Sequence, residues 1–328
     1  MPVSAPGRIC RGNITGTAAV RPMPPLHTGA EVSVCFAYDS KVRKSVRVNV
    51  WFYIIVMAVI QGIAEFLPIS SSGHLALLGA LFGFDGEKSQ ALGIVLHAGS
   101  LLAIVIFYWK TLLGFLKPEQ WRLAAMLILG TIPAGVLGMA LELSGFAKDL
   151  FDNLMVIGFA FLITATLLRL SEKPKLIIRP SGQEDAEPTP LDKISVRQAL
   201  AIGIGQMFAI LPGLSRSGTT ITVGILTGVN REAAGTFSFL LAIPVIAGAA
   251  LVHAYKMFKH PPEAGDITYL QMAVGLVVSA AVSFWALSFL TRLIKRGKLA
   301  CFAWYLYILG AGVILWQLTV MIRKANGL

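Results

Sequence analysis

Two polar stretches interrupt an otherwise apolar chain, and together they carry the residue types of a phosphoryl-transfer site. The first runs from Gln61 to His74 (QGIAEFLPISSSGH), and the second runs from Gln206 to Thr219 (QMFAILPGLSRSGT). An ionisable side chain within an apolar segment is costly to place in lipid, so its presence there indicates a functional site. We therefore take these two stretches as the candidate site.

Glu65 is the carboxylate of the first stretch. It lies four residues after Gln61, so the two side chains share one face of a helix. At membrane depth a glutamate must be neutral, paired with a cation or bound to a metal. We expect Glu65, assisted by Gln61, to hold a divalent metal. The alternative is a neutral glutamic acid that is hydrogen-bonded to another helix.

His74 follows three serines and a glycine, at the expected start of a short helix. The positive end of a helix binds anions, and an imidazole serves as proton donor, proton acceptor or nucleophile. The serines offer helix capping, phosphate binding or a nucleophilic hydroxyl. The residues leave open whether His74, Ser71 or a water attacks phosphorus. This group consists of Ser70, Ser71, Ser72, Gly73 and His74. Three other histidines lack such neighbours, and we expect them to be structural: His97, His253 and His260.

The second stretch is typical of a phosphate cradle, in which hydroxyls, the N–H groups of a helix start and one guanidinium surround an anion. Its members are Ser215, Arg216, Ser217, Gly218 and Thr219. No charged residue lies near Arg216 in the sequence. Its alternative role is a structural ion pair with Glu65 or Glu142.

The composition indicates a polytopic helical membrane protein. The chain has 328 residues, of which 55% are hydrophobic and 14% are charged, whereas soluble proteins carry about 25% charged residues. Several apolar windows are long enough to cross a hydrocarbon core. The formal charge of +11 lies mostly in short loops, which is the topological signal of membrane proteins, so we expect no nucleic-acid partner. The cysteine spacing predicts neither a disulfide framework nor a zinc site.

The same pattern of apolar segments occurs twice. In the first half we expect helices over residues 48–67 and 70–84, broken at Pro68, and then spans over 90–109, 121–143 and 153–170. In the second half, after a polar linker over 171–194, we expect helices over 195–211 and 215–229, and then spans over 232–256, 269–291 and 301–322. At one constant offset Gln61 aligns with Gln206, and Ser70 with Ser215.

These patterns predict an all-α polytopic membrane protein with two inverted repeats, because three crossings in each half invert the second. Each repeat would hold a re-entrant helical hairpin and three transmembrane helices, with the site at the repeat interface. The membrane domain would cover residues 48–325, with repeats over about 48–170 and 195–325. Residues 1–47 lack an apolar period, and we expect a disordered extension or a start codon assigned too far upstream.

The motifs over residues 61–74 and 211–218, with SFLLAIP over 238–244, resemble those of the undecaprenyl-diphosphate phosphatases of the bacitracin-resistance type. The resemblance extends over about residues 48–325. It implies a phosphatase of the bacterial inner membrane that converts undecaprenyl diphosphate to the monophosphate carrier of cell-wall synthesis and confers bacitracin resistance. It also implies inverted repeats, re-entrant helices and a divalent metal, Mg²⁺ or Ca²⁺.

By position, the resemblance assigns function to Glu65, Ser71, His74 and Arg216. We expect the other residues of the two motifs that bind the lipid diphosphate to be Gln61, Ser70, Ser72, Gly73, Ser215, Ser217, Gly218 and Thr219. Many members have a second glutamate at the position of Gln61, so this chain has fewer anionic metal ligands. A homodimer is left open. The rival function is a lipid-phosphate transporter or flippase, because inverted repeats with broken helices are also transporter anatomy.

Overall fold

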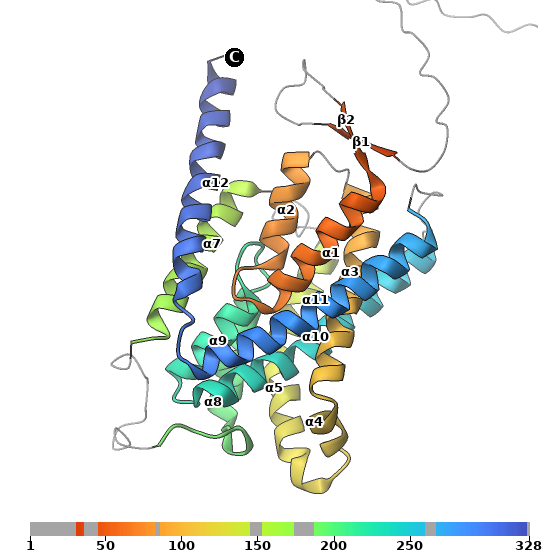
Figure 1. The fold of residues 1–328 in the computed structure, drawn as a ribbon. Coiled ribbons are helices and arrows are strands. Elements are labelled where there is room, and N and C mark those ends of the chain that lie inside the picture. Colours follow the sequence, from red (N-terminus) through yellow and green to blue (C-terminus); the bar gives the residue numbers. More distant parts are fainter. Residues whose placement is uncertain are drawn as a thin grey trace, which may run out of the picture.

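The computed structural model describes residues 31–35, 45–82, 86–144, 153–173, 187–259 and 267–326. In these ranges the chain forms a helical bundle (Figure 1), preceded by two short antiparallel strands, β1 (Glu31–Cys35) and β2 (Ser45–Asn49). The sequence analysis did not predict these strands. They lie inside or at the edge of the expected extension over residues 1–47, whose other residues are outside the described part of the chain.

The first half begins with two helices separated by a short turn and continues with longer ones. They are α1 (Val50–Phe66), α2 (Ser71–Phe82), α3 (Gly86–Phe107), α4 (Trp109–Gly114), η1 (Pro118–Gln120), α5 (Trp121–Ser144) and α7 (Leu154–Leu170). The second half repeats the order after a short 3-10 turn. It contains η3 (Leu191–Lys193), α8 (Val196–Phe208), α9 (Arg216–Leu226), α10 (Arg231–Lys259), α11 (Tyr269–Lys295) and α12 (Cys301–Ala325).

Every helix expected from the sequence is present, with small differences at the ends. The short elements α4, η1 and η3 were not predicted, because each is too brief to produce a periodic pattern. Much of the polar linker, residues 174–186, lies outside the described residues.

Four of the described helical segments are long and apolar enough to cross a membrane: Pro118–Ser144, Arg231–Val252, Tyr269–Lys295 and Cys301–Ala325. Of the remaining two segments that we expected to cross, one is the shorter apolar helix Leu154–Leu170, and the other includes the apolar part of α3, Leu92–Phe107. With four such segments, the chain is a multi-pass membrane protein.

Both expected helix breaks are present, and each is fixed by local backbone chemistry. Pro68 disfavours helical geometry at Leu67, and Ser70 then adopts a left-handed conformation with φ of 71°. Such a conformation is uncommon outside glycine. In the second half Gly213 has φ of 87°, and the Ser215 side chain caps α9 by accepting from the Gly218 N–H at 3.1 Å. Each break therefore starts a new short helix in the protein interior.

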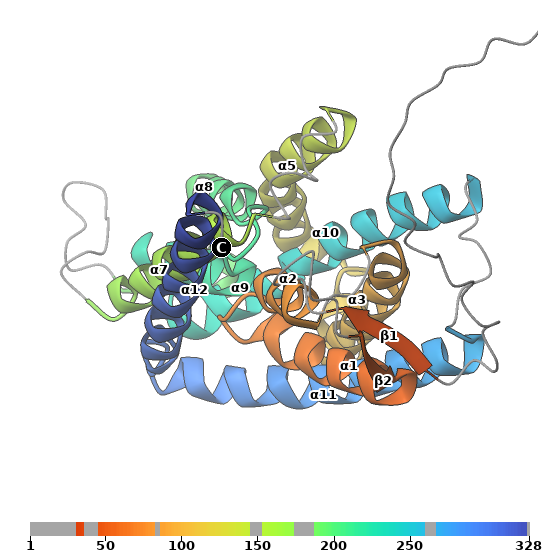
Figure 2. The same cartoon turned by 90° about the horizontal axis from the view of Figure 1, so that it is seen from above.

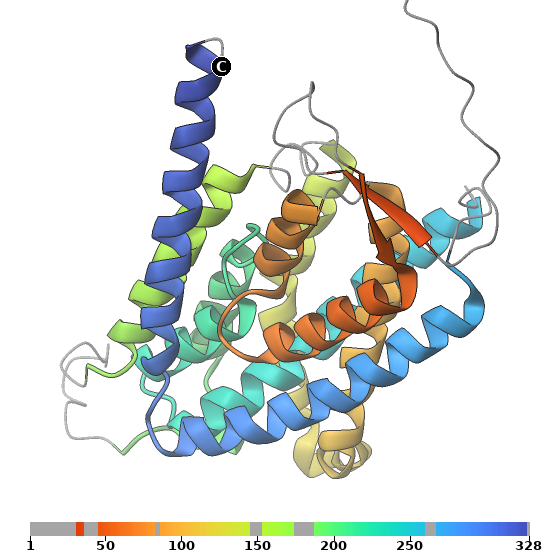
Figure 3. The same ribbon diagram turned by 45° about the horizontal axis from the view of Figure 1, so that its top comes forward.

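Small and hydroxylated residues bring the surrounding helices close together. Helix α11 packs along α1 and α3, and α12 packs along α7 (Figure 3). Between α3 and α11 the Ser100 and Ser283 hydroxyls lie 2.9 Å apart, and Ser279 donates to the Leu96 carbonyl at 2.7 Å. In the view from above, the short helices α2 and α9 lie toward the middle of this bundle (Figure 2). The longer helices thus surround the two breaks.

We expect Gly213→Ala to destabilise the protein. A Cβ at this position would lie 2.7 Å from the Ile157 carbonyl oxygen and 2.9 Å from the Ala160 Cβ, and the left-handed backbone alone costs a non-glycine residue roughly 1–3 kcal/mol. The measurement is the thermal unfolding midpoint in detergent. The control is Gly135→Ala in α5, where a Cβ meets nothing within 4 Å and alanine favours the helix by about 1 kcal/mol. Equal midpoints for the two variants would contradict this account of the break.

Candidate active site

The two helix breaks pack against each other, as the sequence predicted. A Cβ at Gly73, in the first turn of α2, would lie 2.9 Å from the Gly213 Cα of the second break. A Cβ at Gly218, in α9, would lie 3.2 Å from the Pro68 Cβ of the first break. Glycine at positions 73 and 218 therefore permits the backbones of the two halves to approach closely.

Glu65 and Arg216 form an ion pair across this junction. Arg216 Nη2 donates to Glu65 Oε1 at 2.8 Å, and the exposed fractions of the two side chains are 13% and 7%. One residue ends α1 in the first half, and the other begins α9 in the second. The ion pair that we considered as the alternative role of Arg216 is thus present, and Glu65 has the cation it needs.

The second oxygen of the same carboxylate accepts two hydrogen bonds from the first half. Ser71 Oγ donates to Glu65 Oε2 at 2.8 Å, and Gln61 Nε2 donates to it at 3.0 Å. Gln61 is fully buried. We call these three residues and Arg216 the carboxylate cluster. Of the predicted site residues, it brings together Gln61, Glu65, Ser71 and Arg216.

His97 also faces the carboxylate cluster, although the sequence analysis expected a structural role. Its Nε2 lies 3.7 Å from Glu65 Oε2, and its Nδ1 lies 2.7 Å from the Gly93 carbonyl oxygen. The proximity arises from the packing of α3, which no local spacing encodes. The His253 side chain and His260 lie outside the described residues.

His74 points away from the carboxylate cluster, toward α7 and α12. Its Nδ1 lies 2.8 Å from the Ser70 carbonyl oxygen, and its Nε2 lies 2.6 Å from the Tyr305 hydroxyl. The imidazole stacks on the Tyr305 ring, with centroids 5.7 Å apart and an interplanar angle of 12°, and it contacts Phe161. His74 is thus joined to the cluster through the first turn of α2. No sequence pattern pointed to Tyr305, because α12 is remote from both motifs.

The other predicted hydroxyls mainly hold the two breaks in place. Ser70 Oγ accepts from the Gly73 N–H at 3.3 Å and lies 3.3 Å from Ser72 Oγ. In the second half Ser215 Oγ lies 3.2 Å from Ser217 Oγ, which itself donates to the Leu67 carbonyl at 3.3 Å. The hydrogen bonds to Ser70 and Ser215 satisfy backbone N–H groups at the starts of the short helices. The bond from Ser217 to Leu67 links the two halves.

Several buried polar atoms of both motifs have no hydrogen-bond partner among the described residues. They include Arg216 Nη1, Gln61 Oε1 and Thr219 Oγ1, together with both amide atoms of Gln206. Buried polar atoms of native proteins are nearly always paired with protein, water or a ligand. Arg216 Nη1 is therefore a charged donor that remains available to an anion beside Glu65.

The residues present fit a magnesium ion whose other ligands are phosphate oxygens of the substrate. Among the described residues, no three His, Cys, Asp or Glu side chains gather as a metal site. However, Mg²⁺ is commonly held by one or two carboxylates together with substrate phosphates. Glu65 Oε1 accepts one hydrogen bond, so a lone pair remains on it, and Gln61 Oε1 offers a second oxygen donor.

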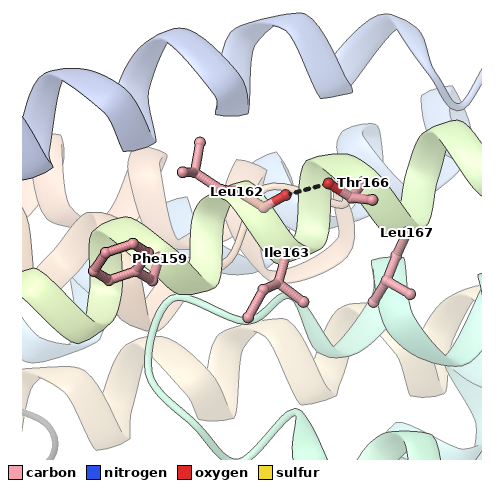
Figure 4. A pocket seen from close by; sticks show the side chains of 5 residues that line it. All are labelled: Phe159, Leu162, Ile163, Thr166 and Leu167. Atoms are coloured by element: carbon pink, nitrogen blue, oxygen red, sulfur yellow. Dashed lines mark hydrogen bonds between the residues drawn. The ribbon is translucent and has the colours of Figure 1, made fainter.

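An apolar pocket of about 260 Å³ lies along α7 (Figure 4). Its lining residues are Phe159, Leu162, Ile163, Thr166 and Leu167. Phe159 and Ile163 are more than half exposed, so the pocket opens on the outer face of the bundle. It takes no part in the carboxylate cluster.

Breaking the ion pair should destabilise the protein strongly. Arg216→Met leaves an uncompensated buried carboxylate, and removing one partner of such a pair costs about 3–5 kcal/mol. The double variant Glu65→Gln/Arg216→Met should recover most of this loss, which thermal unfolding of the four proteins in detergent would measure. The control is Lys295→Met, which removes an exposed ion pair with Glu232 and should cost at most about 1 kcal/mol. A double variant no more stable than Arg216→Met would refute a buried pair.

Comparisons with known proteins identify the family of the chain. The family model described as "Bacitracin resistance protein BacA" matches residues 54–312. The chain is 37% identical over 276 residues to a Bacteroides thetaiotaomicron protein named undecaprenyl-diphosphatase, covering 82% of this chain and 99% of the relative. A Halothermothrix orenii protein of the same name is 36% identical over 267 residues, covering 80% and 97%. Since the family model matches residues 54–312, which is more than half of the chain and includes both helix breaks, the chain belongs to the BacA family of bacitracin resistance proteins.

Proposed function

We propose that the chain is a membrane phosphatase that hydrolyses undecaprenyl diphosphate to undecaprenyl phosphate and inorganic phosphate. This activity recycles the lipid carrier of cell-wall synthesis and confers bacitracin resistance. The observation that carries the proposal is the Glu65–Arg216 contact at 2.8 Å, which joins an acid/base group and an anion-binding group from opposite halves. The relatives, all named undecaprenyl-diphosphatase, support the same reaction.

Arg216 holds the diphosphate in this proposal. Its Nη2 is engaged by Glu65, whereas its buried Nη1 has no acceptor among the residues that the structure describes. The helices α2 and α9 both begin at the junction of the breaks, so their positive ends favour an anion there. The hydroxyls of Ser72, Ser217 and Thr219 belong to the first turns of these two helices. Guanidinium and helix starts together would neutralise the charge that develops on the transferred phosphoryl group.

Ser71 is the nucleophile that the contacts favour. Its Oγ donates to Glu65 at 2.8 Å, which is the distance required between a nucleophile and its base. The Ser71 oxygen bonds to the terminal phosphorus as the bridging P–O bond breaks, undecaprenyl phosphate leaves, and the hydroxyl proton passes to Glu65. A water then attacks the phosphoserine, the bond between phosphorus and the Ser71 oxygen breaks, and Glu65 returns the proton.

His74 is the second base of the reaction in this proposal. The hydrogen bond between Nδ1 and the Ser70 carbonyl places the proton on Nδ1, since a carbonyl only accepts. Nε2 is consequently the basic nitrogen. In the reaction it exchanges its hydrogen bond with the Tyr305 hydroxyl for one with the attacking water, takes that water's proton and then releases it to solvent. The sequence analysis left the nucleophile open among His74, Ser71 and water. The position of His74 against Tyr305 rather than beside Arg216 leads us to prefer Ser71.

A divalent metal, Mg²⁺ or Ca²⁺, would bind to Glu65 with help from Gln61 and the diphosphate oxygens. When bound it would supply charge neutralisation to the phosphate oxygens. Glu65 also accepts hydrogen bonds from Arg216 and Ser71. Loss of this carboxylate would therefore disturb metal binding, the placement of Arg216 and the activation of Ser71 at once.

The finer architecture is also a proposal. The pairs α1/α2 and α8/α9 occupy equivalent places in the two halves, and three long helical elements follow each pair. Helices α2 and α9 have 12 and 11 residues, or about 18 and 17 Å at 1.5 Å per residue, which is short of a hydrocarbon core of about 30 Å. These features support two inverted repeats with re-entrant hairpins. The family supports a place in the bacterial inner membrane.

The rival function, a lipid-phosphate transporter, gains no support from the comparisons. The relatives reported above carry the name of a hydrolase, and a transporter does not require a hydroxyl beside a carboxylate. We therefore keep the hydrolase as the single proposal.

Purified protein in detergent should release phosphate from undecaprenyl diphosphate. We expect Ser71→Ala, Glu65→Gln and Arg216→Met each to lower kcat by at least about 100-fold, because each removes an acid/base or charge-stabilising group. The matched controls are Ser288→Ala, which removes a hydroxyl from α11, and Lys295→Met; both should keep normal rates. Tight lipid binding by the wild type without phosphate release would overturn the enzyme and favour the transporter.

Metal removal should stop phosphate release. After chelation, Mg²⁺ or Ca²⁺ should restore the rate. Mn²⁺ measured by electron paramagnetic resonance should bind the protein only when the lipid diphosphate is present, since the diphosphate supplies most of its ligands. Glu65→Gln should weaken this binding roughly 10- to 100-fold. Full activity in chelator would refute the metal requirement.

A further inference from the structure

Tyr305 is hydrogen-bonded to the basic nitrogen of His74, the residue that we propose as the second base. Its hydroxyl lies 2.6 Å from His74 Nε2, and its ring stacks on the imidazole at 12°. Tyr305 is 45% exposed, so burial does not force it into this contact. A short hydrogen bond and a stacked ring on the same partner together define the orientation of His74.

The hydrogen bonds also fix the chemistry of this contact. Because the Ser70 carbonyl accepts from His74 Nδ1, neutral His74 has a lone pair on Nε2, and Tyr305 must donate its O–H to it. A hydroxyl is both a donor and an acceptor. Tyr305 donates to Nε2 of the neutral imidazole at rest and accepts from Nε2 once that nitrogen carries a proton.

We propose that Tyr305 is a positioning residue for His74. Its hydroxyl and ring hold the imidazole in the tautomer whose basic nitrogen is Nε2, and the hydrogen bond limits the access of other reactants to Nε2. The proposal rests on the proposed function in taking His74 as a base. It means that the second half contributes to the site twice, through Arg216 on α9 and through Tyr305 on α12.

The packing of α12 supports a fixed position for Tyr305. Helices α7 and α12 meet at two glycines: a Cβ at Gly310 would lie 2.8 Å from the Gly158 carbonyl oxygen. This close contact holds α12 on the helix whose Phe161 also touches His74.

The test is Tyr305→Phe, which keeps the stacked ring and removes only the hydroxyl. Diethyl pyrocarbonate modifies unprotonated histidine nitrogens, and mass spectrometry of the His74 peptide follows its rate. We expect His74 to react about fivefold faster in the variant, the fold-change that corresponds to one hydrogen bond of about 1 kcal/mol. We also expect kcat for phosphate release to fall roughly 10- to 100-fold, as with other residues that orient a functional histidine, while KM changes less than about twofold.

The matched control is Tyr307→Phe, which removes a hydroxyl from the same helix and a hydrogen bond to α7. It should change neither the modification rate of His74 nor kcat. Unchanged His74 reactivity in Tyr305→Phe would overturn the inference even if the enzyme slowed, and so would unchanged kcat. Absence of phosphate release from the wild type would instead count against the proposed function, while the reactivity measurement would still decide the contact.

Discussion

A buried carboxylate needs a cation, and the pairing of Glu65 with Arg216 places demands on much of the fold. The two residues belong to helices α1 and α9, which are separated by about half the chain and meet only because both helices end or begin inside the bundle. Pro68 and Gly213 create these interior ends. Gly73 and Gly218 leave room for the two backbones at the point of contact. The longer helices surround this junction.

The same interaction explains why a structural contact and the proposed catalytic site coincide here. A buried ion pair contributes little net stability, since desolvation offsets much of the attraction. The polar atoms of the two residues that do not form the ion pair are more informative about function. Arg216 has a spare charged donor, and Glu65 accepts from a hydroxyl that is suited to attack phosphorus. The pair therefore holds both groups ready for an anionic substrate, which the membrane supplies in the form of a lipid diphosphate.

Most of the helices could be predicted from the sequence, because their apolar length and the residues Pro68 and Gly213 act locally. The meeting of the two motifs could also be predicted, from the repeated Gln, Ser and Gly positions. His97 and Tyr305 could not, because α3 and α12 bring them to the site through tertiary packing that leaves no mark in their own spacing. The orientation of His74 toward Tyr305, away from Arg216, has the same cause.

The most direct test of the account is a structure of the protein with a non-hydrolysable undecaprenyl diphosphate analogue. The account predicts that one terminal phosphate contacts Arg216 Nη1 from the second half and lies beside Ser71 Oγ from the first. A diphosphate bound to residues of one half alone, or bound with Arg216 still engaged only by Glu65, would contradict it.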